Sequence, residues 1–155
     1  MRILRDYQFT TPRDRGACVA IGNFDGVHIG HRAVIDLARN AARDQNAPLG
    51  ILTFEPHPRQ FFAPDAPAFR LTGPEARAHR LEKIGIDILY ELNFNAALSS
   101  LSPQDFAQKV LAKGLGVRHV VVGADFHFGA KRSGTTELLC EFGKALGFGV
   151  TIADL

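Results

Sequence analysis

The sequence predicts an α/β fold, a three-layer α/β/α sandwich built around a parallel sheet of five strands. Short apolar runs alternate with segments whose apolar residues recur at helical spacing along the chain of 155 residues. Several runs, such as residues 49–54, are continuously apolar, which is typical of parallel strands covered on both faces. The intervening segments are long enough for the right-handed helical crossovers that join parallel strands.

The expected strands are short, apolar and rich in β-branched residues, and they lie near residues 17–21, 49–54, 86–92, 117–122 and 149–152. Four helices are expected between them, and they begin near residues 32, 73, 102 and 135. The second helix starts with a capping box over Thr72–Glu75 that has a proline in its first turn. Residues 1–17 are expected to form a leading loop with, at most, a short strand at Ile3 and Leu4.

The size and charge of the chain restrict its class. A chain of 155 residues is large enough for one domain with a real core, and 46% hydrophobic with 22% charged residues is a globular balance. The net charge of +2 gives no reason to expect nucleic acid or a membrane surface as a partner, and no segment is long enough to span a bilayer. We therefore expect a cytoplasmic protein in which Cys18 and Cys140 are buried, reduced thiols. The sequence does not indicate an oligomeric state.

The most informative stretch is Gly22–His31, Gly-Asn-Phe-Asp-Gly-Val-His-Ile-Gly-His, which joins the first strand to the first helix. Its three glycines allow a tight turn and a close approach of the backbone to a ligand. The helix start that follows presents unpaired N–H groups and the positive end of its dipole, which together favour a phosphate. His28 and His31 lie in this turn and can donate hydrogen bonds to phosphate oxygens.

A second candidate segment, Glu55–Phe62, follows the next strand. It contains two prolines, and we expect a loop without helix. The loop leaves the carboxyl end of a strand, which is the edge of a parallel sheet where ligands bind. Phe54, Phe61 and Phe62 could form one wall of an aromatic slot there, although Phe54 is equally well explained as a core residue.

A third candidate segment, Gly123–Gly134, leaves the fourth strand at the same edge. It is rich in glycine and carries Asp125 together with two bases, Lys131 and Arg132. Charged residues in loops are usually solvated, and we expect this of the two bases. His79, on the second expected helix, is likewise expected to be a surface residue.

These segments carry a resemblance to a known family. His28–His31 resembles the His-x-Gly-His signature of the nucleotidyltransferase superfamily, and the ten-residue stretch resembles the adenylyltransferase half of bacterial bifunctional riboflavin kinase/FAD synthetase. Residues 53–58, Thr-Phe-Glu-Pro-His-Pro, are similar to the segment that lines the flavin site in that family. Gly123–Gly129 is similar to its Gly-x-Asp/Asn-Phe-x-Phe-Gly segment, which contacts the nucleotide. The resemblance covers nearly the whole chain and implies a Rossmann-like nucleotidyltransferase fold.

The resemblance implies an FMN adenylyltransferase, which transfers the adenylyl group of ATP to FMN and yields FAD and pyrophosphate. FMN and ATP would be the small-molecule substrates, with Mg²⁺ held mostly by the phosphates and water, and no metal is expected to be held by the protein alone. The implied catalytic residues are His28 and His31. The implied ATP-binding residues are Gly22, Asn23, Phe24, Gly30 and Asp125. The implied flavin-binding residues are Phe54, Pro56, His57, Pro58 and Phe62.

Other interpretations of these residues remain open. The two histidines could be structural, or they could bind zinc with His57 or Asp25, although zinc sites need three or four converging ligands. Asn23 and Asp25 could simply fix the turn through hydrogen bonds to the backbone. The chain could also be a flavin- or nucleotide-binding module without catalysis, or a nucleotidyltransferase with a different phosphorylated acceptor.

One departure from the family's pattern bears on activity. The family carries a second phosphate-binding segment, Ser-Ser-Thr-x-x-Arg, one strand after the helix expected at residues 135–146, and this sequence ends before that point. The riboflavin kinase half is also absent from it. We therefore expect residues 1–155 to be an FMN adenylyltransferase domain truncated at its C-terminus, with impaired adenylyl transfer.

Overall fold

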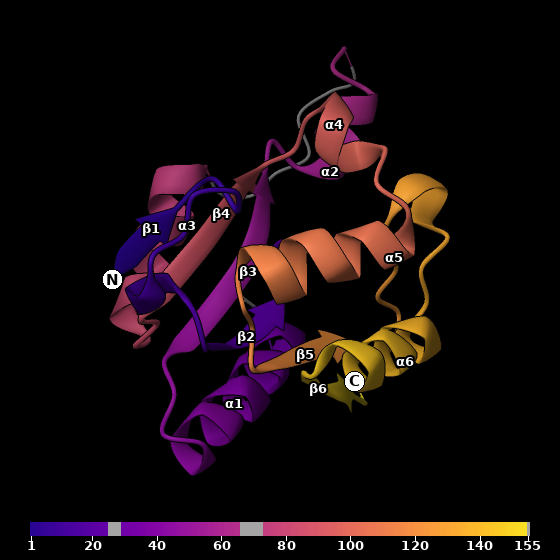
Figure 1. Ribbon diagram of the computed structural model, residues 1–155. Helices are drawn as coiled ribbons and strands as arrows, with labels where there is room; N and C mark the ends of the chain where they lie inside the picture. Colours follow the sequence, from indigo (N-terminus) through magenta and orange to yellow (C-terminus); the bar gives the residue numbers. More distant parts are fainter. Residues whose placement is uncertain (25–28, 66–72, 155) are drawn as a thin grey trace.

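The computed structural model describes residues 1–24, 29–65 and 73–154 of the chain. Within these ranges, six parallel strands form one sheet in the order β1-β4-β3-β2-β5-β6 (Figure 1). The strands are β1 (Arg2–Leu4), β2 (Cys18–Ile21), β3 (Leu49–Glu55), β4 (Ile88–Asn93), β5 (His119–Gly123) and β6 (Gly149–Ala153). The predicted α/β class and parallel sheet are confirmed, whereas the predicted count of five strands was wrong.

The additional strand is β1, at the position where the sequence allowed at most a short strand. Its residues pair with β4 in a register that runs from Arg2 opposite Ile88 to Leu4 opposite Tyr90. A strand of three residues is too short to show the alternation by which strands are identified in a sequence. Pairing with β4, rather than local pattern, therefore determines β1.

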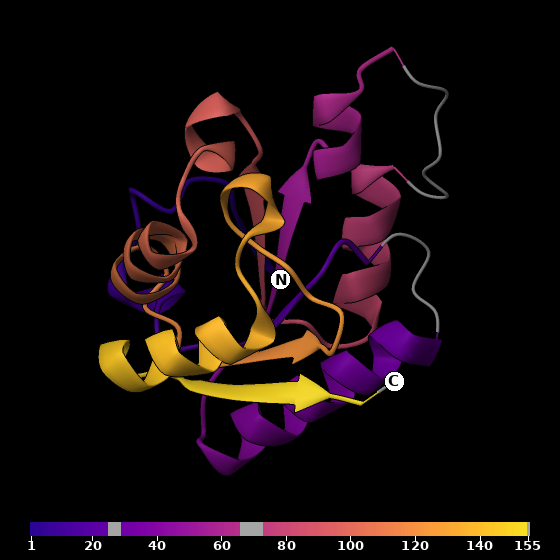
Figure 2. The ribbon, with the colours of Figure 1, turned by 90° about the vertical axis from the view of Figure 1, so that its right-hand side faces the viewer.

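Helices cover both faces of the sheet, as Figure 2 shows. One face carries α1 (Ile29–Asp44) and α3 (Pro74–Lys83). The other face carries α5 (Pro103–Asp105), η2 (Phe106–Gly114) and α6 (Thr136–Leu146). The connections contain the short helices α2 (Pro58–Phe62), α4 (Ala96–Ser99), η1 (Pro12–Asp14) and η3 (Ala130–Arg132). The three predicted layers are thereby confirmed.

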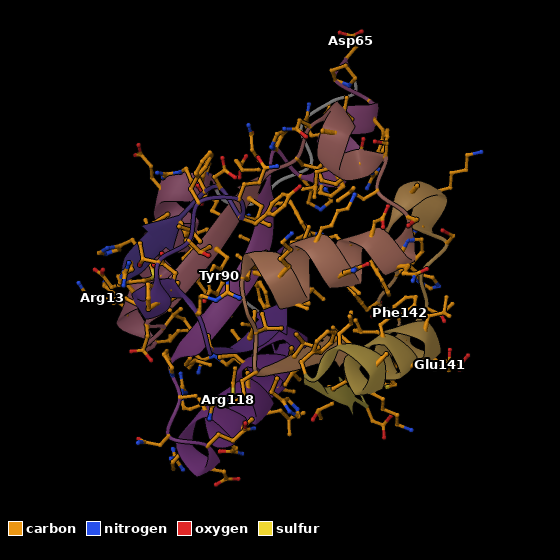
Figure 3. All side chains as sticks on the ribbon, in the orientation of Figure 1. Arg13, Asp65, Tyr90, Arg118, Glu141 and Phe142 are labelled. Atoms are coloured by element: carbon orange, nitrogen blue, oxygen red, sulfur yellow. The ribbon has the colours of Figure 1, made fainter. Side chains whose placement is uncertain are left out.

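Alternate residues of each central strand serve the two layers. In β2, Val19 and Ile21 pack into the core beneath η2 and α6, whereas Cys18 and Ala20 pack beneath α1, and all four are buried. Tyr90 of β4 is fully buried in the η2 layer (Figure 3). Coverage on both faces explains why the strands appear in the sequence as continuous apolar runs.

The four short helices in the connections were not predicted, and α2 and α4 show why. The helix α2 occupies the segment where two prolines predicted a loop, because proline is tolerated at the first helical position, where no hydrogen bond of its N–H is lost. Pro58 stands at that position, and Nδ1 of His57 accepts a hydrogen bond from the N–H of Arg59 at 3.0 Å. The helix α4 begins after Asn95, whose side chain accepts from the N–H of Leu98.

The helix expected from Ser102 differs in type. Ser102 caps α5, but from Phe106 onward the backbone forms a π-helix. At its end, the N–H of Leu115 bonds to the carbonyl of Val110, five residues earlier, at 2.8 Å. Apolar spacing does not distinguish a π-helix from an α-helix, so the sequence could not predict this change.

Other helix ends follow the sequence more closely. Pro74 stands in the first turn of α3, as predicted, whereas Thr72 of the expected capping box lies outside the described residues. The helix α6 ends at Gly147, whose φ of 93° is the left-handed conformation that glycine adopts readily. The helix α1 begins at Ile29, about one turn before the expected Arg32.

Both cysteines are free, with Cys18 buried and Cys140 half-buried. Burial raises the pKa of the Cys18 thiol, which keeps it in the neutral, weakly reactive form.

In the described part of the chain, no helix has the length and apolar character needed to cross a bilayer.

The strand order places a topological switch point between β2 and β5. From β2 the chain continues to β3 and β4 on one side of the sheet, while β5 and β6 lie on the other. In parallel sheets, ligands bind at the carboxyl ends of the strands where connections diverge in this way. Those residues predicted for the site that the structure describes lie in, or shortly after, β2, β3 and β5, at this one edge.

Candidate functional site

The turn after β2 is held by hydrogen bonds to neighbouring elements. The N–H of Gly22 donates to the carbonyl of Leu52 at 3.1 Å. The carbonyl of Asn23 accepts from two donors, the Thr53 hydroxyl at 3.3 Å and Nη1 of Arg77 at 3.1 Å. Thr53 and Arg77 are both buried, so the backbone at Asn23 has a fixed orientation.

Phe24 anchors the same turn in the core. Its side chain is 1% exposed and packs in the layer beneath α1, while its backbone has a left-handed φ of 52°. A bulky residue adopts this conformation only where its surroundings hold it there. The Phe24 ring lies 5.1 Å from the ring of His31, which is half-buried. The packing of Phe24 therefore helps to place His31 at the start of α1.

The first turn of α1, Ile-Gly-His-Arg, contains Gly30 and His31 and no acidic side chain. The first N–H groups of a helix have no partner within it and, together with the helix dipole, favour an anion. His28 and Asp25 lie outside the described residues. Of the residues predicted for this turn, the structure places at the β2–α1 connection Gly22, Asn23, Phe24, Gly30 and His31.

Phenylalanine rings form a continuous series at this edge, which we call the aromatic row. Neighbouring ring centroids in the row are between 5.2 and 6.3 Å apart, within the range favoured by aromatic pairs. The row consists, in spatial order, of Phe62, Phe61, Phe94, Phe54, Phe106, Phe128 and Phe126.

The aromatic row connects two of the predicted segments, the one after β3 and the one after β5. Phe62, at one end, is 69% exposed, whereas Phe54 is half-buried and also packs against the core. Both explanations considered for Phe54 are therefore compatible with its position. Phe94 and Phe106 join the two segments, and neither was predicted from the sequence as a site residue. The only available signal for Phe94 was its place directly after a strand.

Pro56, His57 and Pro58 form the link between β3 and α2. The peptide bond from Glu55 to Pro56 is cis, His57 caps α2, and Pro58 is the first residue of that helix. All three predicted residues are half-buried. Their common role in the structure is to place α2, and with it Phe62, beside the carboxyl end of β3.

The connection after β5 contributes Asp125, which is exposed. Two backbone hydrogen bonds between Phe128 and Gly134, at 3.2 and 2.7 Å, close the loop that follows. Lys131 and Arg132 are exposed, as expected, and both have left-handed φ values, 56° and 55°.

A buried ion cluster that was not predicted from the sequence lies beside the site. Arg77 of α3 is 2% exposed, and its Nη2 lies 3.0 Å from a carboxylate oxygen of Glu55 and 3.4 Å from one of Glu91. In the sequence, Arg77 belongs to a charged helical segment of the kind that usually faces solvent. Its only signal of burial is the position one turn before Leu81, which is fully buried.

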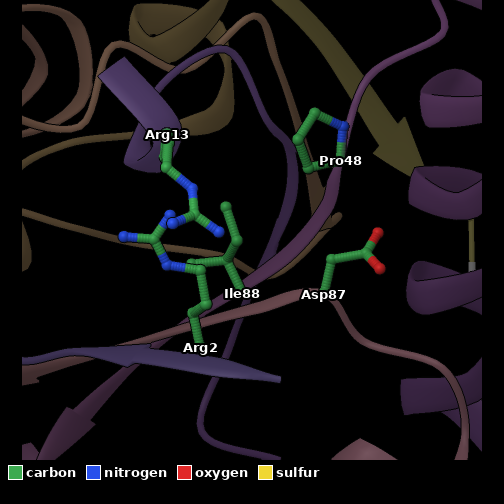
Figure 4. A pocket seen from close by; sticks show the side chains of 5 residues that line it. All are labelled: Arg2, Arg13, Pro48, Asp87 and Ile88. Atoms are coloured by element: carbon green, nitrogen blue, oxygen red, sulfur yellow. The ribbon is translucent and has the colours of Figure 1, made fainter. Parts of the chain in front are cut away.

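Two cavities lie apart from the turn after β2. One, of about 430 Å³, is at the opposite edge of the sheet, where Figure 4 shows Arg2 and Arg13 close to one another beside Ile88. The other, of about 520 Å³, lies beside the end of β4, and its described lining includes Glu55 and Glu91. The described lining of neither cavity includes a residue of the aromatic row. Within the described ranges, no three His, Cys, Asp or Glu side chains gather in a way that could hold a metal ion.

Known proteins match this chain over nearly its full length. The family profile described as FAD synthetase matches residues 10–155. The bifunctional riboflavin kinase/FMN adenylyltransferase of Pseudomonas fluorescens is 41% identical over 155 residues, which are 99% of this chain and 49% of that protein. The protein of the same name from Escherichia coli (strain K12) is 36% identical over 152 residues, which are 97% of this chain and 49% of that protein. The chain thus spans about half the length of these curated relatives.

Solved structures agree with the fold. A crystal structure described as a macrolide-efflux protein from Streptococcus pneumoniae has a TM-score of 0.81 at 26% identity, covering 99% of this chain and 50% of that one. The pantothenate synthetase of Thermus thermophilus has a TM-score of 0.58 at 17% identity, covering 100% of this chain and 61% of that one, and shows a shared fold alone. From the profile match and the sequence identity together, the chain belongs to the FAD synthetase family.

Proposed function

We propose that the chain is an FMN adenylyltransferase module. In the reaction, an oxygen of the FMN phosphate attacks the α-phosphate of ATP, the bond to the β-phosphate breaks, and FAD and pyrophosphate result. No protein nucleophile takes part. Such transfers are accelerated mainly by positioning the two substrates and by donors that match the charge developing on the phosphates. Family membership supports this reaction class.

The observation that carries the proposal is the meeting of two features at one edge of the sheet. The first is the start of α1, with His31 in its first turn and no acidic side chain there. The second is the aromatic row, which reaches the surface at Phe62. A helix start suits a pyrophosphate, and a row of rings suits the flat isoalloxazine of a flavin. The two features match the two chemically distinct parts of FAD.

On the ATP side, the substrate is the magnesium complex of ATP, in which phosphate oxygens and water hold most of the metal's coordination positions. The imidazoles of His28 and His31 would donate hydrogen bonds to the phosphates. Asp125, exposed after β5, would approach the nucleoside. The backbone of the turn would face the phosphates at Gly22, Asn23, Phe24 and Gly30. Phe24 can act there only through its backbone, since its ring is buried.

On the flavin side, the exposed ring of Phe62 and the half-buried ring of Phe54 would stack on the isoalloxazine. Pro56, His57 and Pro58 would act indirectly, by holding α2 in place. Because FMN and ATP are small water-soluble molecules, we propose that the protein acts in the cytoplasm without nucleic acid or a membrane as partner.

Titration of the 155-residue chain with FMN and with ATP and Mg²⁺ tests the proposal. We expect saturable binding of one molecule of each. The variant His31→Gln should weaken ATP binding about tenfold, because a charge-assisted donor to phosphate is worth about 1.5–3 kcal/mol. His79→Gln is the matched control, since His79 is exposed on α3 and lies outside the site, and its affinities should equal those of the unaltered chain.

Mass spectrometry of mixtures containing FMN, ATP and Mg²⁺ follows turnover separately. Formation of FAD and pyrophosphate supports transfer, whereas binding of both substrates without any FAD favours a binding module instead. Failure of the chain to bind FMN at all, under conditions where it is folded, contradicts the proposal.

A further inference from the structure

We propose that Arg77 is a positioning residue that locks the phosphate turn after β2 to the flavin segment after β3. The inference rests on the proposed function for its consequences, but its geometry stands on its own. A single guanidinium contacts the backbone of one segment and a side chain of the other, and Arg77 is buried.

The contacts of Arg77 run in two directions. Its Nη1 donates to the carbonyl of Asn23 at 3.1 Å, in the turn that leads to the phosphate site. Its Nη2 donates to the carboxylate of Glu55 at 3.0 Å, in the residue that precedes Pro56 and the flavin segment. The guanidinium thus lies between the carboxyl ends of β2 and β3, on the side of α3.

Burial makes these contacts strong and specific. Arg77 is 2% exposed and Glu91 5% exposed, and a charge at this depth requires a partner of opposite sign. Glu91 on β4 provides one at 3.4 Å and is paired on its other side with Arg5 at 3.3 Å. Glu91 thus balances the charge at Nη2, the nitrogen that also bonds Glu55, while Nη1 bonds the carbonyl of Asn23.

Each of the two residues that Arg77 orients leads along the chain to a proposed substrate-binding side chain. From Asn23, the chain enters Phe24, whose left-handed backbone and buried ring place His31, with ring centroids 5.1 Å apart. From Glu55, the chain enters the link Pro56–Pro58, which leads into α2, and α2 ends at Phe62. A shift of Arg77 would therefore displace donors for phosphate and the stacking wall for flavin together.

Arginine is required for this arrangement because of its shape. A planar guanidinium donates in fixed directions from separate nitrogens, whereas a lysine ammonium is a compact charge on a flexible stem. Lysine at this position would keep the charge that Glu91 requires but could not bond Asn23 and Glu55 in the same geometry. Arg77→Lys therefore separates positioning from charge.

The test compares Arg77→Lys with Arg5→Lys, since both arginines pair with Glu91 and only Arg77 contacts the two segments. Without ligand, hydrogen–deuterium exchange in Arg77→Lys should become about tenfold faster in two segments together. These are the turn after β2, including the amide of Gly22, and α2, including the amide of Phe61. Exchange in β5 and β6 should not change. FMN and ATP affinities should both fall about tenfold, because misplacement of groups lowers binding on each side. Arg5→Lys should leave exchange and both affinities as they are.

Faster exchange across the whole sheet, or in only one of the two segments, would overturn the proposal, as would unchanged affinity for both ligands. If Arg77→Lys does not fold, Glu91→Gln replaces it, because the carboxylate of Glu91 pairs with Arg77 and Arg5, and the same paired pattern is expected. If Arg77→Lys changes exchange in both segments but the unaltered chain binds neither FMN nor ATP, the positioning role of Arg77 stands and the proposed function is refuted.

Discussion

Side chains of one type have different roles in this molecule according to their depth. Phe24 is 1% exposed, Phe62 69% and Phe9 78%. A ring that is fully buried stabilises the fold by about 1.5–3 kcal/mol, whereas an exposed ring contributes little. Phe62 differs from Phe9 because it continues the aromatic row, with its centroid 5.2 Å from that of Phe61. Exposure next to other rings therefore marks Phe62 as available to a flat ligand.

Phe62→Ala should lower the affinity for FMN about tenfold, since one aromatic pair contributes about 0.5–1.5 kcal/mol beyond the area that it buries. The free energy of unfolding should fall by no more than about 1.5 kcal/mol, because the exposed ring loses only its contacts with Phe61 and Phe94. Flavin fluorescence titration measures the first quantity and urea denaturation the second. Phe9→Ala is the control and should change neither. Equal FMN affinity of Phe62→Ala and the unaltered chain would remove the flavin assignment from this segment.

At this scale, the sequence indicated residues that adjoin a recognisable motif and missed those that reach the site through tertiary contacts. Phe54 and Phe62 flank the Pro-His-Pro link and were predicted. Phe94 meets Phe54 only because β3 pairs with β4, which also brings the N–H of Phe94 to within 3.0 Å of the Glu55 carbonyl oxygen. Arg77 lies on α3, 54 residues after Asn23 in the sequence, and no local pattern relates the two residues.

Helices and strands whose apolar residues recur regularly were predicted from the sequence, whereas elements held by a few specific contacts were not. The helices α1, α3 and α6 are amphipathic over ten or more residues, so their apolar spacing identified them. The strand β1 and the helices α2 and α4 span three to five residues and depend on pairing or capping instead. The leading segment, expected to be a loop, illustrates this second class.

In that segment, η1 fastens the N-terminus to the sheet through Asp14, which is 3% exposed. The carboxylate accepts from the Thr11 N–H at 2.8 Å and from its hydroxyl at 3.1 Å, and it pairs with Arg2 of β1. The backbone hydrogen bond from Thr11, with contributions from the Thr11 hydroxyl and from Arg2, holds the pKa of Asp14 below its ordinary value. The ionised carboxylate is therefore the form that stabilises the fold.

Asp14→Asn should lower the free energy of unfolding at neutral pH by about 1–3 kcal/mol, because a neutral amide replaces a buried carboxylate that accepts charge-assisted hydrogen bonds from Thr11 and Arg2. Because the pKa is lower in the folded chain than in the unfolded one, this contribution is complete above the unfolded value of about 3.9 and is lost as pH falls through the folded value. Urea denaturation across this range should show the two proteins converging at acid pH. A difference that persists undiminished in acid would contradict this account. Asp65→Asn, at the exposed position beyond α2 in Figure 3, should change stability by less than about 0.5 kcal/mol.

At the scale of the whole molecule, the parallel sheet gathers the site from distant parts of the chain. Loops that follow β2, β3 and β5 come together because those strands are neighbours and run in one direction. The sequence predicted this common edge from the order of strands and helices alone. It could not predict the continuous contact of the aromatic row across the edge, since that depends on how η2 packs against β3 and on the loop after β5.

A crystal structure of the chain with FAD tests the central claim most directly, because FAD contains both chemical parts that the edge is proposed to recognise. The account predicts the pyrophosphate at the start of α1, within hydrogen-bonding distance of His31, and the isoalloxazine against Phe62 and Phe54. FAD bound elsewhere, or a His31 ring that remains packed on Phe24 with no phosphate near it, would contradict the account.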